Sequence, residues 1–375
     1  MIASEARPKI VLHIGQGKTG TSALQSALAR NHELLKSAGV LYPEHASAEQ
    51  ARAGHVMSGN LDPENWFEGQ VIPIVAAAPG YASYIFSSEH LFRRMDAFFA
   101  AEGRYRDLYD FEILMAVRSP IEMLPSVYQQ AVKRGGFHED IAAFAEHETS
   151  TRIAADLVAA MERQGIAFTL FNYSVIRDAI VPRILDHIGV HAIVEGGHAA
   201  TVGRVNRSLT LAELAFVRFV NQIFGADYGR LIADALVNEL PDIDGQLPPL
   251  DEALRRDVIA RNRAAVERLN ACLPHTEQID LDAGQVPPPP RADAALSAEQ
   301  AALIRRIFPS ALTPADGVIL RDIAMTHEQA APLSRDQAIH LMEYARKARP
   351  HGQIIAGKLT EWRAARDAEA GRTKD

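Results

Sequence analysis

The residues best suited to chemistry lie near the N-terminus, in the run HIGQGKTGTS at positions 13–22. An apolar stretch at 10–12 precedes this run, and a helical pattern begins at Thr21 or Ser22. Glycines let backbone N–H groups approach an anion, and a helix N-terminus adds partial positive charge. A lysine adds a full charge and hydroxyls add donors. The pattern therefore predicts a phosphate-binding loop made of Gly17, Lys18, Thr19, Gly20, Thr21 and Ser22.

The spacing within this loop argues against an ATPase-type phosphate loop. That motif reads G-x-x-x-x-G-K-[ST], with its first glycine five residues before the second. If Gly17 is taken as the second glycine, Leu12 occupies the position of the first. Leu12 belongs to the predicted strand, so the loop is too short to wrap a nucleoside triphosphate in that way.

A second pair of candidate ligands lies about 100 residues further along the chain. The apolar run at 111–117 predicts a strand that ends at Arg118, and a helical pattern follows at 121–133. Ser126 lies in that helix, eight residues after Arg118. An arginine presents a bidentate fork to a phosphate, and a serine adds an O–H donor.

Together the two patterns resemble those of sulfotransferases that use 3′-phosphoadenosine 5′-phosphosulfate (PAPS), and most closely the bacterial and glycan-type group. The resemblance implies that the Lys-Thr-Gly-Thr loop holds the 5′-phosphosulfate and that Arg118 and Ser126 hold the 3′-phosphate. It also implies that Lys18 stabilises the oxygen bridging sulfur and phosphorus, and that adenosine 3′,5′-bisphosphate (PAP) is the product. A late basic loop closes the 3′-phosphate site in many such enzymes, which makes Arg204 and Arg207 further candidates.

The resemblance also requires a base near the acceptor. Glu89 and His90 follow the strand predicted at 84–86. Side chains alternate along an extended chain, so one of the two is expected to face the acceptor. Cytosolic sulfotransferases use a His at this strand end, and glycan-type enzymes use a Glu. The Ser-Ser-Glu context favours Glu89, with His90 as the alternative.

Composition sets the broad class. The chain has 375 residues, 47% hydrophobic and 23% charged, with a net charge of −8, which gives no overall field to attract nucleic acid. Cys272 is the only cysteine, so an intramolecular disulfide is impossible. The first eight residues lack the apolar core of a signal peptide, and no apolar run reaches membrane-spanning length. We therefore expect a cytoplasmic protein without a membrane span, and the alanine-rich composition suits a bacterial source.

The order of elements predicts an α/β fold. Strands at 9–14, 84–86, 111–117 and 168–173 alternate with helical patterns, which is typical of a central parallel sheet flanked by helices. This is the P-loop NTPase-like arrangement of sulfotransferases, in which ligands bind at the carboxyl ends of the strands. Beyond residue 196 the patterns are helical, and four prolines at 287–290 form a stiff link. We expect a sulfotransferase domain at 1–286 and a helical C-terminal extension at 287–375, packed on or next to it.

The sequence thus predicts a PAPS-dependent sulfotransferase acting on a hydroxyl or amine of a small molecule or glycan, with a carbohydrate as the expected acceptor. No metal is expected, because lysine and arginine neutralise the donor. The C-terminal helices are expected to form either the acceptor pocket or a contact between copies of the chain. Two alternatives stay open: a nucleoside-triphosphate-dependent small-molecule kinase on a related fold, and a nucleotide-binding protein without catalysis.

Overall fold

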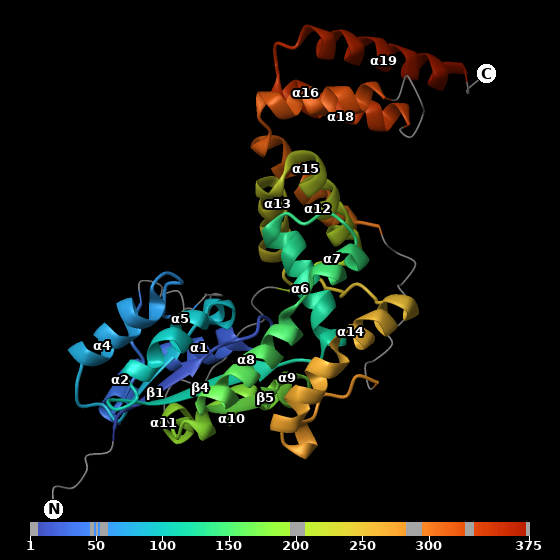
Figure 1. Cartoon of the computed structure of the whole chain (residues 1–375). Helices are drawn as coiled ribbons and strands as arrows, with labels where there is room; N and C mark the ends of the chain where they lie inside the picture. Colours follow the sequence, from blue (N-terminus) through green and yellow to red (C-terminus); the bar gives the residue numbers. More distant parts are fainter. Residues whose placement is uncertain are drawn as a thin grey trace, which may run out of the picture. The chain divides into compact units, whose positions relative to one another are not determined.

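Five short apolar segments pair into one sheet in the computed structural model, which describes residues 7–45, 49, 52, 59–195, 207–282, 295–326 and 334–372 (Figure 1). The strands run in the order β2-β3-β1-β4-β5, and every pairing is parallel. Their bounds are β1 Lys9–His13, β2 Val40–Leu41, β3 Ser83–Ser87, β4 Asp110–Val117 and β5 Ala167–Asn172. The expected parallel α/β class is confirmed.

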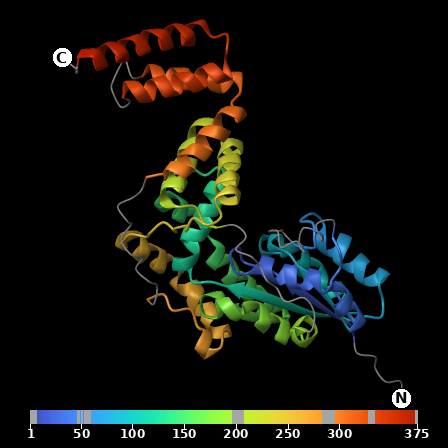
Figure 2. The same cartoon turned by 180° about the vertical axis from the view of Figure 1, so that it is seen from behind.

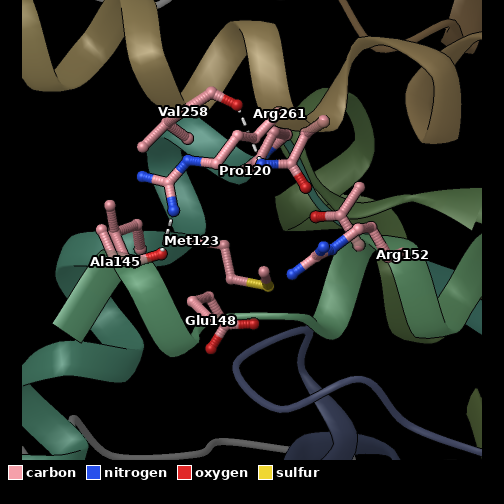
Figure 3. Close-up of a pocket in the computed structure, with 10 residues that line it drawn as sticks. Pro120, Met123, Ala145, Glu148, Arg152, Val258 and Arg261 are labelled. Carbon is pink, nitrogen blue, oxygen red and sulfur yellow. Dashed lines mark hydrogen bonds between the residues drawn. The ribbon is translucent and has the colours of Figure 1, made fainter.

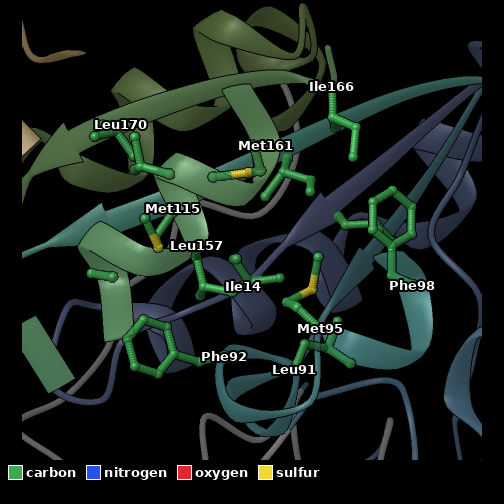
Figure 4. Close-up of a cluster of buried hydrophobic side chains, with 14 of the residues drawn as sticks. Ile14, Leu91, Phe92, Met95, Phe98, Met115, Leu157, Met161, Ile166 and Leu170 are labelled. Atoms are coloured by element: carbon green, nitrogen blue, oxygen red, sulfur yellow. The ribbon is translucent and has the colours of Figure 1, made fainter. Parts of the chain in front are cut away.

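The sheet is buried on both faces because alternate residues of each strand feed two separate hydrophobic clusters. One face, which includes Leu12, Phe86 and Met115, packs against α8 (Ser150–Gln164), α14 (Glu252–Cys272) and α5 (Asp96–Ala101). Figure 4 shows part of this cluster around Met115, Met161 and Phe98. The other face packs against α1 (Thr21–Arg30), α2 (His32–Ser37), α10 (Ile180–His187) and α11 (His191–Glu195).

Most of the remaining helical elements around the sheet are short, and α6 is the exception. The helical pattern that begins at Thr21 or Ser22 is interrupted at Asn31, whose side-chain amide donates to the Ala27 carbonyl. The other helical elements of this region are η1 Phe67–Val71, α4 Ile72–Ala77, η2 Glu89–Arg93, η3 Glu102–Arg104, α6 Pro120–Gly135, α7 Ile141–His147, α9 Tyr173–Ile176, η4 Arg177–Ala179 and η5 His275–Glu277.

The chain divides into two compact units, and the division differs from the expected boundary at residue 287. The first unit holds the sheet and comprises Met1–Tyr128, Asp140–Val205 and Pro248–Pro289. The second comprises Gln129–Glu139, Asn206–Leu247 and Pro290–Asp375. The C-terminal helices therefore share their unit with two earlier segments, because α6 continues past Tyr128 and the helices after Asn206 pack with those after Pro290.

In its described parts the second unit is helical (Figure 2). Besides the end of α6, it contains α12 Leu211–Phe224, α13 Ala226–Glu239, α15 Ala298–Ala311, α16 Pro314–Met325, α18 Arg335–Ala348 and α19 Gln353–Arg372. Capping boxes start four of these helices, at Thr210, Ser297, Thr313 and Ser334. Across the parts of the chain that the structure describes, no helix is long and apolar enough to cross a membrane.

Candidate functional site

The loop between β1 and α1 folds back on itself at the carboxyl end of the sheet. Lys18 adopts a left-handed conformation with φ 68°, as does Gly20 with φ 83°. This conformation is uncommon for a residue with a side chain and is found where the surroundings hold it. The Thr19 hydroxyl donates to the Gln16 carbonyl at 2.5 Å, so this side chain closes the turn from inside. Lys18 is exposed while Thr19 is buried.

Two glycines of this loop show where space is tight and where it is open. A Cβ at Gly15 would lie 2.4 Å from the Thr21 Oγ1 atom, so only glycine fits there. A Cβ at Gly17 would meet no atom within 4 Å. The loop is therefore packed against the start of α1 on one side and has room beside Gly17 on the other.

The end of β4 joins this loop directly. The Arg118 backbone N–H donates to Gln16 Oε1 at 3.2 Å, and the Arg118 guanidinium donates from Nη1 to the Lys18 carbonyl at 3.4 Å. β1 and β4 are hydrogen-bonded neighbours, with His13 in register with Leu114. The two predicted phosphate-binding segments, about 100 residues apart in sequence, therefore meet at one edge of the sheet.

The Arg118 side chain is only 9% exposed. Its Nε lies 3.5 Å from the Glu122 carboxylate, and its guanidinium carbon lies 5.4 Å from the centre of the Tyr173 ring. Burial, together with the nearby positive charge of Arg177, lowers the pKa of Arg118. Ser126 is half-buried on α6, four residues beyond Glu122 and thus on the same side of that helix.

Several buried donors around these two segments have no hydrogen-bond partner within the described part of the chain. Among them are Gln16 Nε2 and Ser119 Oγ. Buried polar atoms are nearly always satisfied in folded proteins, so unsatisfied ones call for a ligand or water. An amide NH₂ and a hydroxyl can both donate, and an anion rich in oxygen acceptors would satisfy them.

The two candidate bases, Glu89 and His90, lie in a helical turn and not in the extended strand, so strand alternation does not decide which of them faces the acceptor. β3 ends at Ser87, and Glu89 begins the 3₁₀ turn η2. Glu89 is half-buried and His90 is exposed. Burial raises the pKa of Glu89, while Lys18 and the Thr21 hydroxyl act in the opposite direction. Glu89 therefore shares its surroundings with the loop lysine.

Buried polar side chains meet at Ser87, two residues before Glu89. His13 Nδ1 lies 2.8 Å from the Ser87 hydroxyl, and Gln25 Nε2 lies 3.2 Å from the same hydroxyl. Burial lowers the pKa of His13 to about 4, so the ring is neutral near pH 7. These residues fix the end of β3 against β1 and α1. His13 thus supports the end of the strand through its hydrogen bond with Ser87.

The late basic loop does not supply Arg207 to this site. The Arg207 side chain is 2% exposed and forms a bidentate pair at 2.7 Å with Glu213, which is completely buried. Its other N–H groups donate to the carbonyls of Ser208, Leu236 and Leu240 in the second unit. All of its donors are used, so we withdraw it as a phosphate ligand. Arg204 lies outside the described residues.

Two further site residues, Gln16 and Ser119, adjoin the predicted ones. Gln16 lies inside the loop, and Ser119 directly follows Arg118. The Ser119 backbone N–H donates to the Ser174 hydroxyl at 3.0 Å, which ties the start of α6 to α9. Their positions next to predicted site residues could have identified them, although neither residue type belongs to the phosphate-binding motifs.

A small cavity elsewhere in the first unit is too small for a substrate. It measures about 10 Å³, close to the minimum that holds one water. Figure 3 shows Glu148 and Arg152 beside Met123, with the Arg261 guanidinium donating to the Ala145 carbonyl at 2.9 Å. The described residues also contain no group of three or more His, Cys, Asp or Glu side chains placed to hold a metal ion.

Comparisons with known proteins give little further information. No family model matches the chain, and no curated protein matches it. A sulfotransferase from Alicyclobacillus acidocaldarius, solved by crystallography, is similar at 14% sequence identity with a TM-score of 0.35. The match covers 71% of this chain and 96% of that one. A likeness this weak does not assign an activity to the chain.

Proposed function

We propose that this chain is a PAPS-dependent sulfotransferase that moves a sulfuryl group to an acceptor hydroxyl or amine. The observation that carries the proposal is the direct hydrogen bonding of the Lys18 loop to Arg118 at one sheet edge. A donor nucleotide with phosphate at both ends needs two cationic binding sites that are no further apart than the nucleotide is long. The sequence resemblance implies that these same two segments bind the two phosphate ends.

The order of strands gives the site two distinct ends. Glu89 follows β3, the Lys18 loop follows β1, Arg118 follows β4, and these strands are neighbours in that order. Adjacent strands lie about 4.8 Å apart, so the reacting end belongs near β3 and β1 and the 3′-phosphate near β4. The donors at Gln16 Nε2 and Ser119 Oγ fit an anion along this line.

The residues of the site divide the work of binding and reaction among them. Bound PAPS supplies the sulfuryl group, and PAP remains after transfer. Backbone N–H groups of residues 17–22 bind the 5′ end, and the side chains of Lys18, Thr21 and Ser22 add donors. Arg118 and Ser126 bind the 3′-phosphate. Lys18 neutralises the charge that grows on the oxygen bridging sulfur and phosphorus as its bond to sulfur breaks.

Glu89 is proposed as the base that accepts the proton of the acceptor hydroxyl or amine while the new bond to sulfur forms. A base works best when its pKa lies near the working pH, and burial moves the pKa of Glu89 in that direction. His90 is exposed on the same turn and stays the alternative base. A carbohydrate remains the proposed acceptor, by analogy with the glycan-type group.

The kinase alternative is less well supported by the loop. Leu12, which occupies the position of the first P-loop glycine, is a fully buried strand residue in register with Phe86 and Ile113. The chain there is part of the sheet and has no room to form a longer phosphate cradle.

Titration calorimetry tests the proposal against this alternative. The wild-type protein is titrated with PAP without metal, and separately with ATP and Mg²⁺. We expect micromolar or tighter binding of PAP and at least tenfold weaker binding of ATP–Mg²⁺. Arg118→Ala should weaken PAP binding by about 10- to 100-fold, since it removes charge-assisted hydrogen bonds. A preference for ATP–Mg²⁺ would refute the proposal.

A further inference from the structure

A second arginine, Arg177, belongs to the same cluster as Arg118. It begins the short turn η4, directly after α9 and β5. Its guanidinium carbon lies 5.5 Å from the centre of the Tyr173 ring, and that of Arg118 lies 5.4 Å from the same ring. Both arginines also approach the same oxygen of Glu122, at 3.1 Å for Arg177 and 3.5 Å for Arg118.

The cluster holds two guanidinium groups against one carboxylate. The ion pair of Arg177 with Glu122 stabilises the fold only weakly, because exposed ion pairs contribute only about 0–1 kcal/mol to stability. Repulsion between the two arginines opposes even that gain. An unbalanced positive charge held on a tyrosine ring is suited to binding an anion. Arg177 is 51% exposed, so a ligand can reach it.

The order of the strands indicates which end of the donor nucleotide lies beside this cluster. Arg177 follows β5, on the far side of β4 from the Lys18 loop. β3, which precedes Glu89, and β5 are three strand spacings apart, or about 14 Å. Arg177 therefore lies away from the reacting end. It contacts Glu122, and Ser126 lies one helical turn beyond Glu122 on α6.

We infer that Arg177 is a second guanidinium ligand of the donor's 3′-phosphate, acting with Arg118 across the ring of Tyr173. This inference rests on the proposed sulfotransferase function. It also gives the site the basic residue that Arg207 does not provide, because the donors of Arg207 are all used by its own unit. Glu122 holds the two arginines in place when no phosphate is present.

Calorimetry with two nucleotides tests the inference. PAP carries the 3′-phosphate, whereas adenosine 5′-monophosphate lacks it. We expect Arg177→Ala to weaken PAP binding roughly 10- to 100-fold and to change binding of the monophosphate less than twofold. Arg177→Lys should recover part of the loss, since lysine keeps the charge but not the fork.

Arg268→Ala is a matched control. Arg268 is 48% exposed and pairs with Glu162 at 2.9 Å, near the end of α8 that leads into the start of β5, opposite the site. This variant should leave both affinities within twofold of wild type. Unchanged PAP binding in Arg177→Ala, or equal losses for both nucleotides, would overturn the inference while the proposed function stands. A wild-type protein that binds neither nucleotide would overturn both.

Discussion

Replacing Glu89 with Gln removes the proposed base while keeping the size and most hydrogen-bonding capacity of the side chain. Glu89 is half-buried beside Lys18 and Thr21, so the amide occupies the same place without the ability to take a proton. General-base catalysis contributes about 10²- to 10⁴-fold to a rate. We therefore expect kcat to fall by at least 100-fold and the affinity for PAP to change less than threefold.

The assay is transfer of radiolabelled sulfur from PAPS to a panel of mono- and oligosaccharides, with PAP affinity measured in parallel. His90→Gln is the matched control, because it alters the neighbouring exposed residue and should retain at least half of the wild-type rate. A Glu89→Gln variant within threefold of wild type would refute the assignment. Loss of activity in His90→Gln alone would transfer the role of base to His90.

Three further predictions concern residues around this site and in the second unit. Thr21→Val should move the acidic limb of the kcat/KM profile to higher pH: the Thr21 hydroxyl lowers the pKa of Glu89, and the base is lost as the pH falls through that pKa. Glu89→Gln should have a higher Tm than wild type at pH 7.5, because burial penalises the charged form; the gain should vanish below about pH 4.3, where the unfolded carboxyl is also protonated. A Tm equal to wild type at both pH values would contradict it. Arg207→Ala should cost about 3–5 kcal/mol in urea unfolding by leaving the Glu213 carboxylate buried without its partner, and should leave PAP affinity within twofold; a specific loss of PAP binding would restore Arg207 to the site.

The strands and helix starts could be predicted from sequence because their signals are local. The apolar run at 111–117 falls within β4, and the Ser-x-x-Gln patterns at Ser297 and Ser334 form capping boxes at helix starts. Such patterns depend on residues within one turn or strand. The break at Asn31 was not predicted, since nothing in the helical periodicity interrupts there.

The motifs of the candidate site could be predicted from the sequence, but the hydrogen bonds between its distant segments could not. The Lys18 loop and Arg118 were both identified, whereas the bond from the Arg118 backbone to Gln16 spans 102 residues and depends on β1 and β4 being neighbours. The 3₁₀ turn at Glu89 replaced the expected alternation because the strand ends two residues earlier. Arg207 looked like a phosphate ligand in sequence, and only the folded helices reveal that Glu213 and backbone carbonyls use its donors.

The most direct test of the central claim compares wild-type protein with Lys18→Ala in the same transfer assay. The charge of Lys18 lowers the pKa of Glu89, the proposed base, and Lys18 adopts a left-handed backbone conformation in its loop. We predict that the wild type releases PAP and labels at least one acceptor, and that Lys18→Ala reduces transfer at least 100-fold while the protein stays folded. Transfer by the variant at the wild-type rate would contradict the account.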